Sequence, residues 1–432
     1  TRFVRTEQPS PALEFTPGAD PQGHSPALPP ANTDYLIITH SDFVNAVAPL
    51  GTHRATVDGL NVFTVRVEDI YAAYGELEHE EAIKQYISAA YHQDSSPNLD
   101  YVLLVGDGIM DTQSRSLGLA ANQNFIPPYP LTMDPPWCVR PWCDPWETAS
   151  DNRFVTLDGP DDQLAEVAIG RLPVNTVDEV TTIVDKILTY ELDPPQWPWN
   201  ERVLFFAGNE SDAPYHRYSD DAFATLPITY TGRRVYFCTP GTSDCDGPHL
   251  YDDIGTAHDR AVQELGMGGL LASYVGHSSW HQWALDPTTY APMFHLDDVA
   301  SLHNDGALPV VLEMTCYTSD FSEPTGATLD ETLVRREDGG AVATWGSTTL
   351  GLSLGHNILH QAFLDAVFHG KTTELGEVIQ AAQLDLHNSD DNDYYLDLLD
   401  TFVLLGDPAM DLNLDIVPWA HEIFLPLTIR GS

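Results

Sequence analysis

The feature that most constrains this fold is an alternation of short apolar runs with segments of helical periodicity. Apolar runs at 35–39, 61–67 and 101–105 are typical of β-strands, and between the last two runs apolar residues recur at helical spacing from 83 to 91. Strands that alternate with helices predict a mostly parallel sheet covered by helices on both faces. The expected fold class is therefore α/β.

The same alternation continues along the chain after residue 150. Strands are expected near 166–170, 202–207, 233–238, 269–275, 308–313, 341–345 and 401–405, and helices near 176–191, 256–265, 328–337, 356–369 and 373–387. Thr176 is the expected N-cap of the first of these helices, and Glu179 completes a capping box there.

This pattern divides the chain into two lobes, each with a mostly parallel sheet flanked by helices. The N-terminal α/β lobe is expected at 34–200 and the second lobe at 201–411. Residues 1–33, rich in Pro, Ser and Gly, are expected to be an extended arm or the remnant of a pro-segment, and 412–432 a short C-terminal tail. A segment rich in proline and tryptophan at about 109–150 interrupts the first lobe, and a loop of that length is usually functional or an insertion.

Acidic residues greatly outnumber basic ones, and this imbalance limits the partners of the chain. The 64 Asp and Glu against 19 Lys and Arg give a formal net charge of −45. Such a charge repels nucleic acids and anionic lipid surfaces, and no apolar run approaches the roughly 20 residues that span a bilayer. We therefore expect no nucleic-acid partner and no membrane span. The excess fits either a solvated acidic surface or structural calcium, for which the candidate ligands are Asp158, Asp161, Asp390, Asp391 and Asp393.

Four of the five cysteines form two close pairs. Cys138 and Cys143 lie in the tryptophan-rich segment, and Cys238 and Cys245 flank a Gly/Ser/Asp turn. A disulfide within each pair is expected, and two disulfides favour an oxidising, extracellular environment. Zinc binding is the alternative, although neither pair has the Cys-x-x-Cys spacing of structural zinc sites. In both cases Cys316 has no cysteine near it in sequence.

Cys316 and His277 each follow an apolar run that predicts a buried strand. Ligands of parallel sheets bind beyond the carboxyl ends of the strands, and consecutive strands are often neighbours, so the thiol and the imidazole are expected to meet. An imidazole beside a cysteine lowers the pKa of the thiol and later protonates the leaving amine. A structural thiol and a structural histidine are the alternative. The candidate backbone donors to an oxyanion are the N–H groups of Gly276, Ser278 and Cys316.

Several blocks of this sequence resemble those of the gingipain-type cysteine peptidases, in the caspase–legumain–gingipain clan. Residues 274–280 (YVGHSSW) are similar to the family's histidine block and 313–321 (EMTCYTSDF) to its cysteine block. Further blocks in the family's order are 100–107 (DYVLLVGD), 150–151, 168–173 (AIGRLP), 186–191 and 404–409 (LLGDPA). The resemblance covers about 34–412, and it implies a caspase-like fold with the catalytic lobe at 201–411.

The resemblance also implies an activity and the residues that carry it. The chain is expected to be a secreted or cell-surface cysteine endopeptidase, monomeric and without a catalytic cofactor, that acts on proteins or peptides. Cys316 would form a thioester acyl-enzyme and His277 would act as base and acid, with Asn209 or Glu210 orienting the imidazole. An acidic residue lines the specificity pocket of the arginine-specific relatives, and Asp220 falls at about that position, which implies a basic P1 residue.

The residues expected to contact substrate from the two strand ends are Val275, Met314 and Thr315. At two positions the chain departs from the clan, since Ser278 stands where Gly is usual and Thr315 where Ala is usual. These departures leave open a catalytically silent scaffold that binds calcium or cell-surface partners. A zinc hydrolase built on His356 and His360 is a third hypothesis, although no glutamate completes a His-Glu-x-x-His motif.

Overall fold

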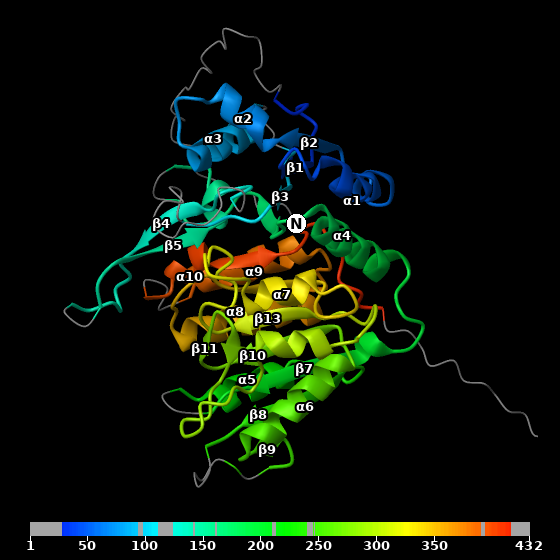
Figure 1. The fold of residues 1–432 in the computed structure, drawn as a ribbon, viewed down its shortest axis with the longest axis vertical. Coiled ribbons are helices and arrows are strands. Elements are labelled where there is room, and N and C mark those ends of the chain that lie inside the picture. Colours follow the sequence, from blue (N-terminus) through cyan, green and yellow to red (C-terminus); the bar gives the residue numbers. More distant parts are fainter. Residues whose placement is uncertain are drawn as a thin grey trace, which may run out of the picture.

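The computed structural model describes residues 28–93, 98–110, 124–140, 143–159, 162–209, 213–239, 245, 247–389 and 394–415. One large sheet runs along the long axis of the molecule (Figure 1). Its strands, in spatial order, are β2 (Val62–Arg66), β1 (Tyr35–Thr39), β3 (Tyr101–Val105), β6 (Ala168–Leu172), β15 (Phe402–Leu405), β14 (Ala343–Ser347), β13 (Val310–Met314), β10 (Leu271–Val275), β7 (Arg202–Ala207), β8 (Thr231–Phe237) and β9 (Leu250–Tyr251). Neighbouring strands are parallel except β14 and β15, which are antiparallel.

Helices cover both faces of this sheet. One face packs against α1 (Val44–Thr56), α4 (Val177–Leu192), α5 (Tyr215–Ala224), α8 (Ser353–Asp365) and α9 (Leu375–His387). The other face packs against α2 (Val67–Ala73), α3 (His79–His92), α6 (Ile254–Gly266) and α7 (Leu329–Arg335). None of the helices in the described part of the chain is long and apolar enough to cross a membrane.

The strand residues alternate between these two faces, as the pleat of a strand requires. In β7, Val203, Phe205 and Ala207 belong to the core under the first set of helices, whereas Leu204 and Phe206 belong to the core under α6 and α7. Both faces of the strand are buried, which is why its sequence is a continuous apolar run without polar alternation.

The strands expected for the two lobes share this one sheet, and β15 joins them. It pairs antiparallel with β14, with Thr344 opposite Leu405, and parallel with β6, with Leu405 opposite Arg171. The backbones approach closely at this joint: a Cβ atom on Gly170 would lie 2.3 Å from the carbonyl oxygen of Gly406. The mostly parallel α/β class is confirmed, and the lobe boundary at residue 200 stays a prediction.

Buried ion pairs account for the polar residues of several motif blocks. Arg171 donates two hydrogen bonds to Asp151, at 2.7 and 2.8 Å, and two more to backbone carbonyls. Arg54 is fully buried and donates to Asp407 at 2.9 Å. Such pairs are costly to break because the remaining partner would be a buried, uncompensated charge. We infer that blocks 150–151, 168–173 and 404–409 hold the sheet together.

The tryptophan-rich segment contains a second, smaller sheet. β4 (Tyr129–Met133) and β5 (Trp146–Ser150) form an antiparallel hairpin that lies beside α10 (Asp397–Thr401) (Figure 1). The expected cap of α4 is confirmed, since the Glu179 N–H donates to the Thr176 hydroxyl at 3.2 Å and the Thr176 N–H donates back to Glu179 at 3.1 Å.

Candidate active site

The register of β10 and β13 brings His277 and Cys316 to the same edge of the sheet. These strands are parallel neighbours, with Val275 directly opposite Met314. The two strands therefore end at the same level of the sheet. His277 follows the end of β10 by two residues, and Cys316 follows the end of β13 by two residues. Cys316 is half-buried and belongs to no disulfide, and His277 is exposed. The expected pairing of the two strands is confirmed, and the meeting of the thiol with the imidazole stays a prediction.

Hydroxyl groups connect the two strand ends below the thiol. The Thr315 hydroxyl donates to the Gly276 carbonyl at 2.7 Å, and the Ser278 and Thr315 hydroxyl oxygens lie 2.6 Å apart. The Ser278 oxygen also accepts from the Cys316 N–H at 3.2 Å and is in hydrogen-bond contact with the Cys316 carbonyl. The two residues that depart from the clan pattern thus contact each other, and Ser278 occupies a backbone donor that was expected to face an oxyanion.

Two tyrosines hold the histidine. The Tyr215 hydroxyl, at the first residue of α5, lies 3.2 Å from His277 Nε2, and the two rings meet edge to face at 5.4 Å between centroids. The Tyr274 hydroxyl donates to the His277 carbonyl at 2.6 Å and accepts from the Ala284 N–H at 2.9 Å. The imidazole is therefore fixed through its ring by one tyrosine and through its backbone by the other.

Glycine is required where the Tyr274 hydroxyl passes between the strand ends. A Cβ atom on Gly276 would lie 2.4 Å from this oxygen, and one on Gly208 would lie 2.9 Å from it. The Tyr274 ring stacks on Trp283 at 4.6 Å. Trp283 belongs to β12 (Gln282–Trp283), which pairs with β11 (Ser278–Ser279), so this stack anchors the hairpin that follows His277.

Two carboxyl groups are buried behind the thiol. Glu313 on β13 is fully buried and accepts from Trp283 Nε1 at 2.9 and 3.0 Å. Asp330 on α7 accepts from the Ser319 hydroxyl, and its charge acts on the neighbouring Glu313. Burial raises the pKa of Asp330 from 3.8 to about 7, and burial with the neighbouring Asp330 charge raises the pKa of Glu313 well above 4.5. The folded protein therefore favours the protonated form of these carboxyls.

The residue after Cys316 adopts an unusual backbone conformation. Tyr317 has φ of 64°, in the left-handed region that non-glycine residues rarely enter. Its N–H donates to the Thr349 carbonyl at 3.2 Å, and the Cys316 thiol donates to the Gly351 carbonyl at 3.8 Å. The segment 347–351, which follows β14, thus supports the turn that presents the thiol.

The candidates for orienting the histidine, Asn209 and Glu210, have no described contact with it. The Asn209 amide donates to the Thr239 hydroxyl at 3.2 Å, so the described contact of this side chain is not with His277. Glu210 lies outside the described residues. Tyr215, which the sequence did not single out, supplies the described contact to the ring instead.

The three residues expected to contact substrate from the strand ends are buried. Val275 and Met314 are each 1% exposed and belong to the core that packs against α5 and α8. Thr315 is 0% exposed and bonded to Gly276 and Ser278. These side chains point into the protein because the strands are buried on both faces, so direct substrate contact through them is corrected to a supporting role.

Asp220, the candidate for binding a basic P1 residue, is already engaged. Its carboxylate accepts from Arg234 at 2.7 Å and from the Tyr236 hydroxyl at 3.0 Å, both on β8. It lies five residues after Tyr215, which is more than one turn of α5 beyond the residue that contacts the histidine. A basic substrate residue would have to displace Arg234 to pair with this carboxylate.

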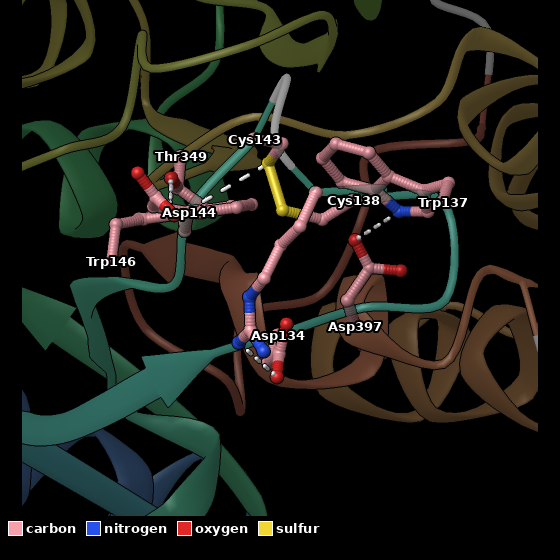
Figure 2. Close-up of a disulfide and its surroundings, with 9 residues drawn as sticks. Asp134, Trp137, Cys138, Cys143, Asp144, Trp146, Thr349 and Asp397 are labelled. Atoms are coloured by element: carbon pink, nitrogen blue, oxygen red, sulfur yellow. Dashed lines mark hydrogen bonds and ion pairs between the residues drawn. A yellow bond between two sulfur atoms is a disulfide. The ribbon is translucent and has the colours of Figure 1, made fainter.

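Both expected disulfides are confirmed. Cys138 pairs with Cys143 and Cys238 pairs with Cys245 (the first is drawn in Figure 2). This outcome replaces the zinc alternative for these four residues.

Nothing in the described residues is arranged as a metal site. No group of three or more His, Cys, Asp or Glu side chains is gathered around a common point there. Of the candidate calcium ligands only Asp158 is described, whereas Asp161, Asp390, Asp391 and Asp393 lie outside the described residues. His356 and His360 are buried on α8, and burial lowers the pKa of each to about 3.

Comparison with known proteins places these features in a family. Residues 28–413 match the model of peptidase family C25. Gingipain R2 of Porphyromonas gingivalis is 23% identical over 371 residues, which cover 81% of this chain and 42% of that protein. Lys-gingipain HG66 of the same species is 26% identical over 200 residues, which cover 46% of this chain and 10% of that protein. The chain thus spans less than half the length of these curated relatives.

The fold has a counterpart among solved structures. The crystal structure of the Arg-specific cysteine proteinase gingipain R matches with a TM-score of 0.69 at 19% identity, over 90% of this chain and 80% of that chain. This likeness confirms the caspase-like form of the α/β fold.

Proposed function

This chain belongs to peptidase family C25, and we propose that it is a cysteine endopeptidase with Cys316 as nucleophile and His277 as proton carrier. The observation that carries the proposal is the parallel register of β10 and β13, which brings an imidazole and a thiol that belongs to no disulfide to adjacent strand ends. The two tyrosine contacts to His277 support it, because a positioned imidazole is what general acid–base catalysis needs.

The proposed reaction is acyl transfer in two steps. His277 takes the proton of the Cys316 thiol, the sulfur attacks the peptide carbonyl carbon, the C–N bond breaks, and the leaving amine takes that proton from His277. Water then attacks the thioester, gives its proton to His277, and the thiolate leaves as the carboxylic acid forms. Protons and electron pairs balance over the two steps without a cofactor.

The oxyanion needs donors near the thiol, and the Cys316 N–H is the nearest backbone candidate. In the structure this N–H donates to the Ser278 hydroxyl. In the proposed mechanism the hydroxyl yields this donor to the substrate oxygen, or the Ser278 N–H serves instead. Preorganised backbone donors of this kind contribute about 100- to 1,000-fold to rate in acyl transfer.

The test is turnover of a mixed peptide library by the wild type and by Cys316→Ala. We expect iodoacetamide to label one cysteine stoichiometrically and to abolish cleavage, and we expect Cys316→Ala to be inactive with an unchanged fold. Cleavage that persists in Cys316→Ala would reject the proposal.

A second candidate function is a catalytically silent member of the same family. The occupied Cys316 N–H and the Ser278–Thr315 contact favour it, because they fill space and donors that catalysis would use. Any turnover by the wild type that is absent from Cys316→Ala excludes this candidate.

Further parts of the proposal concern the environment and the substrate. We propose that the protein acts outside the cell, which its two disulfides favour, as a monomer on protein or peptide substrates. A basic P1 residue is proposed only if Arg234 releases Asp220, and an Arg234→Ala variant that gains cleavage after Arg or Lys would reveal this release. Structural calcium stays a prediction, tested by the change in melting temperature on adding a chelator.

A further inference from the structure

The β4–β5 hairpin reaches the active site from a distant part of the sequence. Trp146 Nε1 donates to the Thr349 hydroxyl at 2.7 Å, across a sequence separation of 203 residues. Two residues further along β5, the Thr148 and Thr348 hydroxyls lie 3.0 Å apart, and Thr348 also donates to the Ala149 carbonyl at 2.8 Å. The hairpin is thus bonded side by side to the segment that follows β14.

That same segment contacts the residues around the nucleophile. The Thr349 carbonyl accepts from the Tyr317 N–H at 3.2 Å, and the Gly351 carbonyl accepts from the Cys316 thiol at 3.8 Å. Leu350 lies between these two contacts and is 39% exposed. Leu350 is therefore an exposed apolar residue between a neighbour that contacts the half-buried Trp146 and a neighbour that contacts the thiol.

The β4–β5 hairpin, which carries Trp146, also contacts α10. The Trp137 and Trp146 rings lie 5.7 Å apart, and Trp137 Nε1 donates to Asp397 of α10 at 3.3 Å. Figure 2 shows the Cys138–Cys143 disulfide between these two tryptophans. Because these contacts already fix Trp146 in place, its side chain loses little conformational entropy when a substrate binds to it.

The charges near the thiol do not favour a basic substrate residue. Asp220 is paired with Arg234, and the side chain that α5 brings to His277 is the aromatic Tyr215. Asp320, four residues after the nucleophile, accepts from the Ser322 hydroxyl, and burial raises its pKa to about 6. Leu350 and Trp146, in contrast, offer apolar contact.

We propose that Leu350 and Trp146 contact the substrate residue next to the scissile bond, and that this residue is apolar. The inference rests on the proposed endopeptidase function and adds to it a substrate class and two specificity-determining residues. A single apolar contact of this kind is worth about 10- to 100-fold in kcat/KM between substrates that keep it and substrates that lack it.

Cleavage-site profiling with a peptide library tests this inference. We expect the wild type to select an apolar residue at one position flanking the cut, and Leu350→Glu to shift that position toward Arg and Lys by about 10-fold or more. Leu192→Glu is the matched control, since Leu192 is exposed at the end of α4, far from the thiol along the sheet, and this variant should keep the wild-type profile.

Two variants of Trp146 separate contact from scaffolding. Trp146→Phe keeps an aromatic face but loses the hydrogen bond to Thr349, and it should retain the apolar preference. Trp146→Ala should lose that preference while its melting temperature stays close to that of Trp146→Phe. If Leu350→Glu leaves the profile unchanged, or if the wild type selects Arg or Lys, the inference is overturned.

A binding measurement keeps this test separate from the test of catalysis. Fluorescent peptides that differ only in one apolar or basic residue are titrated against Cys316→Ala, with and without Leu350→Glu. Tighter binding of the apolar peptide, reversed by Leu350→Glu, supports the inference even if the wild type shows no turnover. Equal binding of both peptides overturns it even if the wild type is an active peptidase.

Discussion

Replacing Tyr274 with phenylalanine should remove most activity without changing either candidate catalytic residue. The hydroxyl is fully buried, donates to the His277 carbonyl at 2.6 Å and accepts from the Ala284 N–H at 2.9 Å. Without it, two buried backbone groups lose a partner, at about 1–3 kcal/mol each, so the free energy of unfolding should fall by at least about 2 kcal/mol. The histidine also loses its backbone anchor, and a displacement of about 1 Å costs about 100-fold in rate.

The assay compares kcat/KM on one cleaved peptide with urea unfolding of the same variant. Tyr35→Phe is the matched control, because the Tyr35 hydroxyl is also buried and donates to Asp407 at 2.9 Å, among the strands at the other end of the sheet. We expect this control to lose stability and keep its kcat/KM. If Tyr274→Phe loses stability to the same degree and keeps the wild-type kcat/KM, then this hydroxyl does not position His277.

Three further outcomes concern other buried contacts. The pKa of Asp330 is raised to about 7, so the folded state holds this proton more tightly than the unfolded state does. The contribution of this proton to stability is therefore full below about pH 4 and is lost as the pH rises through 7. Between about pH 5 and pH 8, the free energy of unfolding measured in urea should fall less for Asp330→Asn than for the wild type. Because Ser278 and Thr315 share a hydrogen bond, Ser278→Ala and Thr315→Val should be non-additive, with a coupling of about 0.5–3 kcal/mol in a double-mutant cycle of unfolding, and additive losses would contradict the shared bond. Arg171→Met should lower the free energy of unfolding by about 3–5 kcal/mol, since Asp151 would be left as a buried charge, and a loss below about 1 kcal/mol would show that this pair is not structural.

The large sheet was predictable where apolar runs are continuous. The runs at 35–39, 101–105 and 202–207 match β1, β3 and β7 at both ends, because strands buried on both faces carry few polar residues. The placement of His277 and Cys316 at neighbouring strand ends followed from the same logic, since β10 and β13 are consecutive strands of the large sheet and the two residues follow their carboxyl ends.

Helices and strands of mixed composition were not predicted from the sequence. α1 contains Pro49, and β4 contains Pro130, residues that argue against a helix interior and a strand interior respectively. α5 has a polar sequence, so neither the helix nor the approach of its first residue, Tyr215, to His277 was foreseen. The single available signal was an aromatic residue just after a proline at the start of a possible helix.

Long-range pairing was the second limit. The position of β15 between β14 and β6 depends on pairing with β6, which lies more than 200 residues earlier in the chain, and no local pattern encodes that contact. In the same way, nothing in the sequence around Asp220 indicated that its carboxylate would pair with Arg234. Partner identity across a sheet is a property of the folded surface, and composition and periodicity report only which residues are buried.

The strand that joins the two halves of the sheet is also the last of its strands along the chain. Until β15 emerges from the ribosome, β6 and β14 are both open edges with unpaired backbone groups. The half that carries Cys316 is therefore completed only when synthesis has passed residue 405. A nascent chain that stops before that point exposes two strand edges, which can pair with other chains. Assembly order in this protein delays the finished thiol centre until nearly all of the described chain has been made.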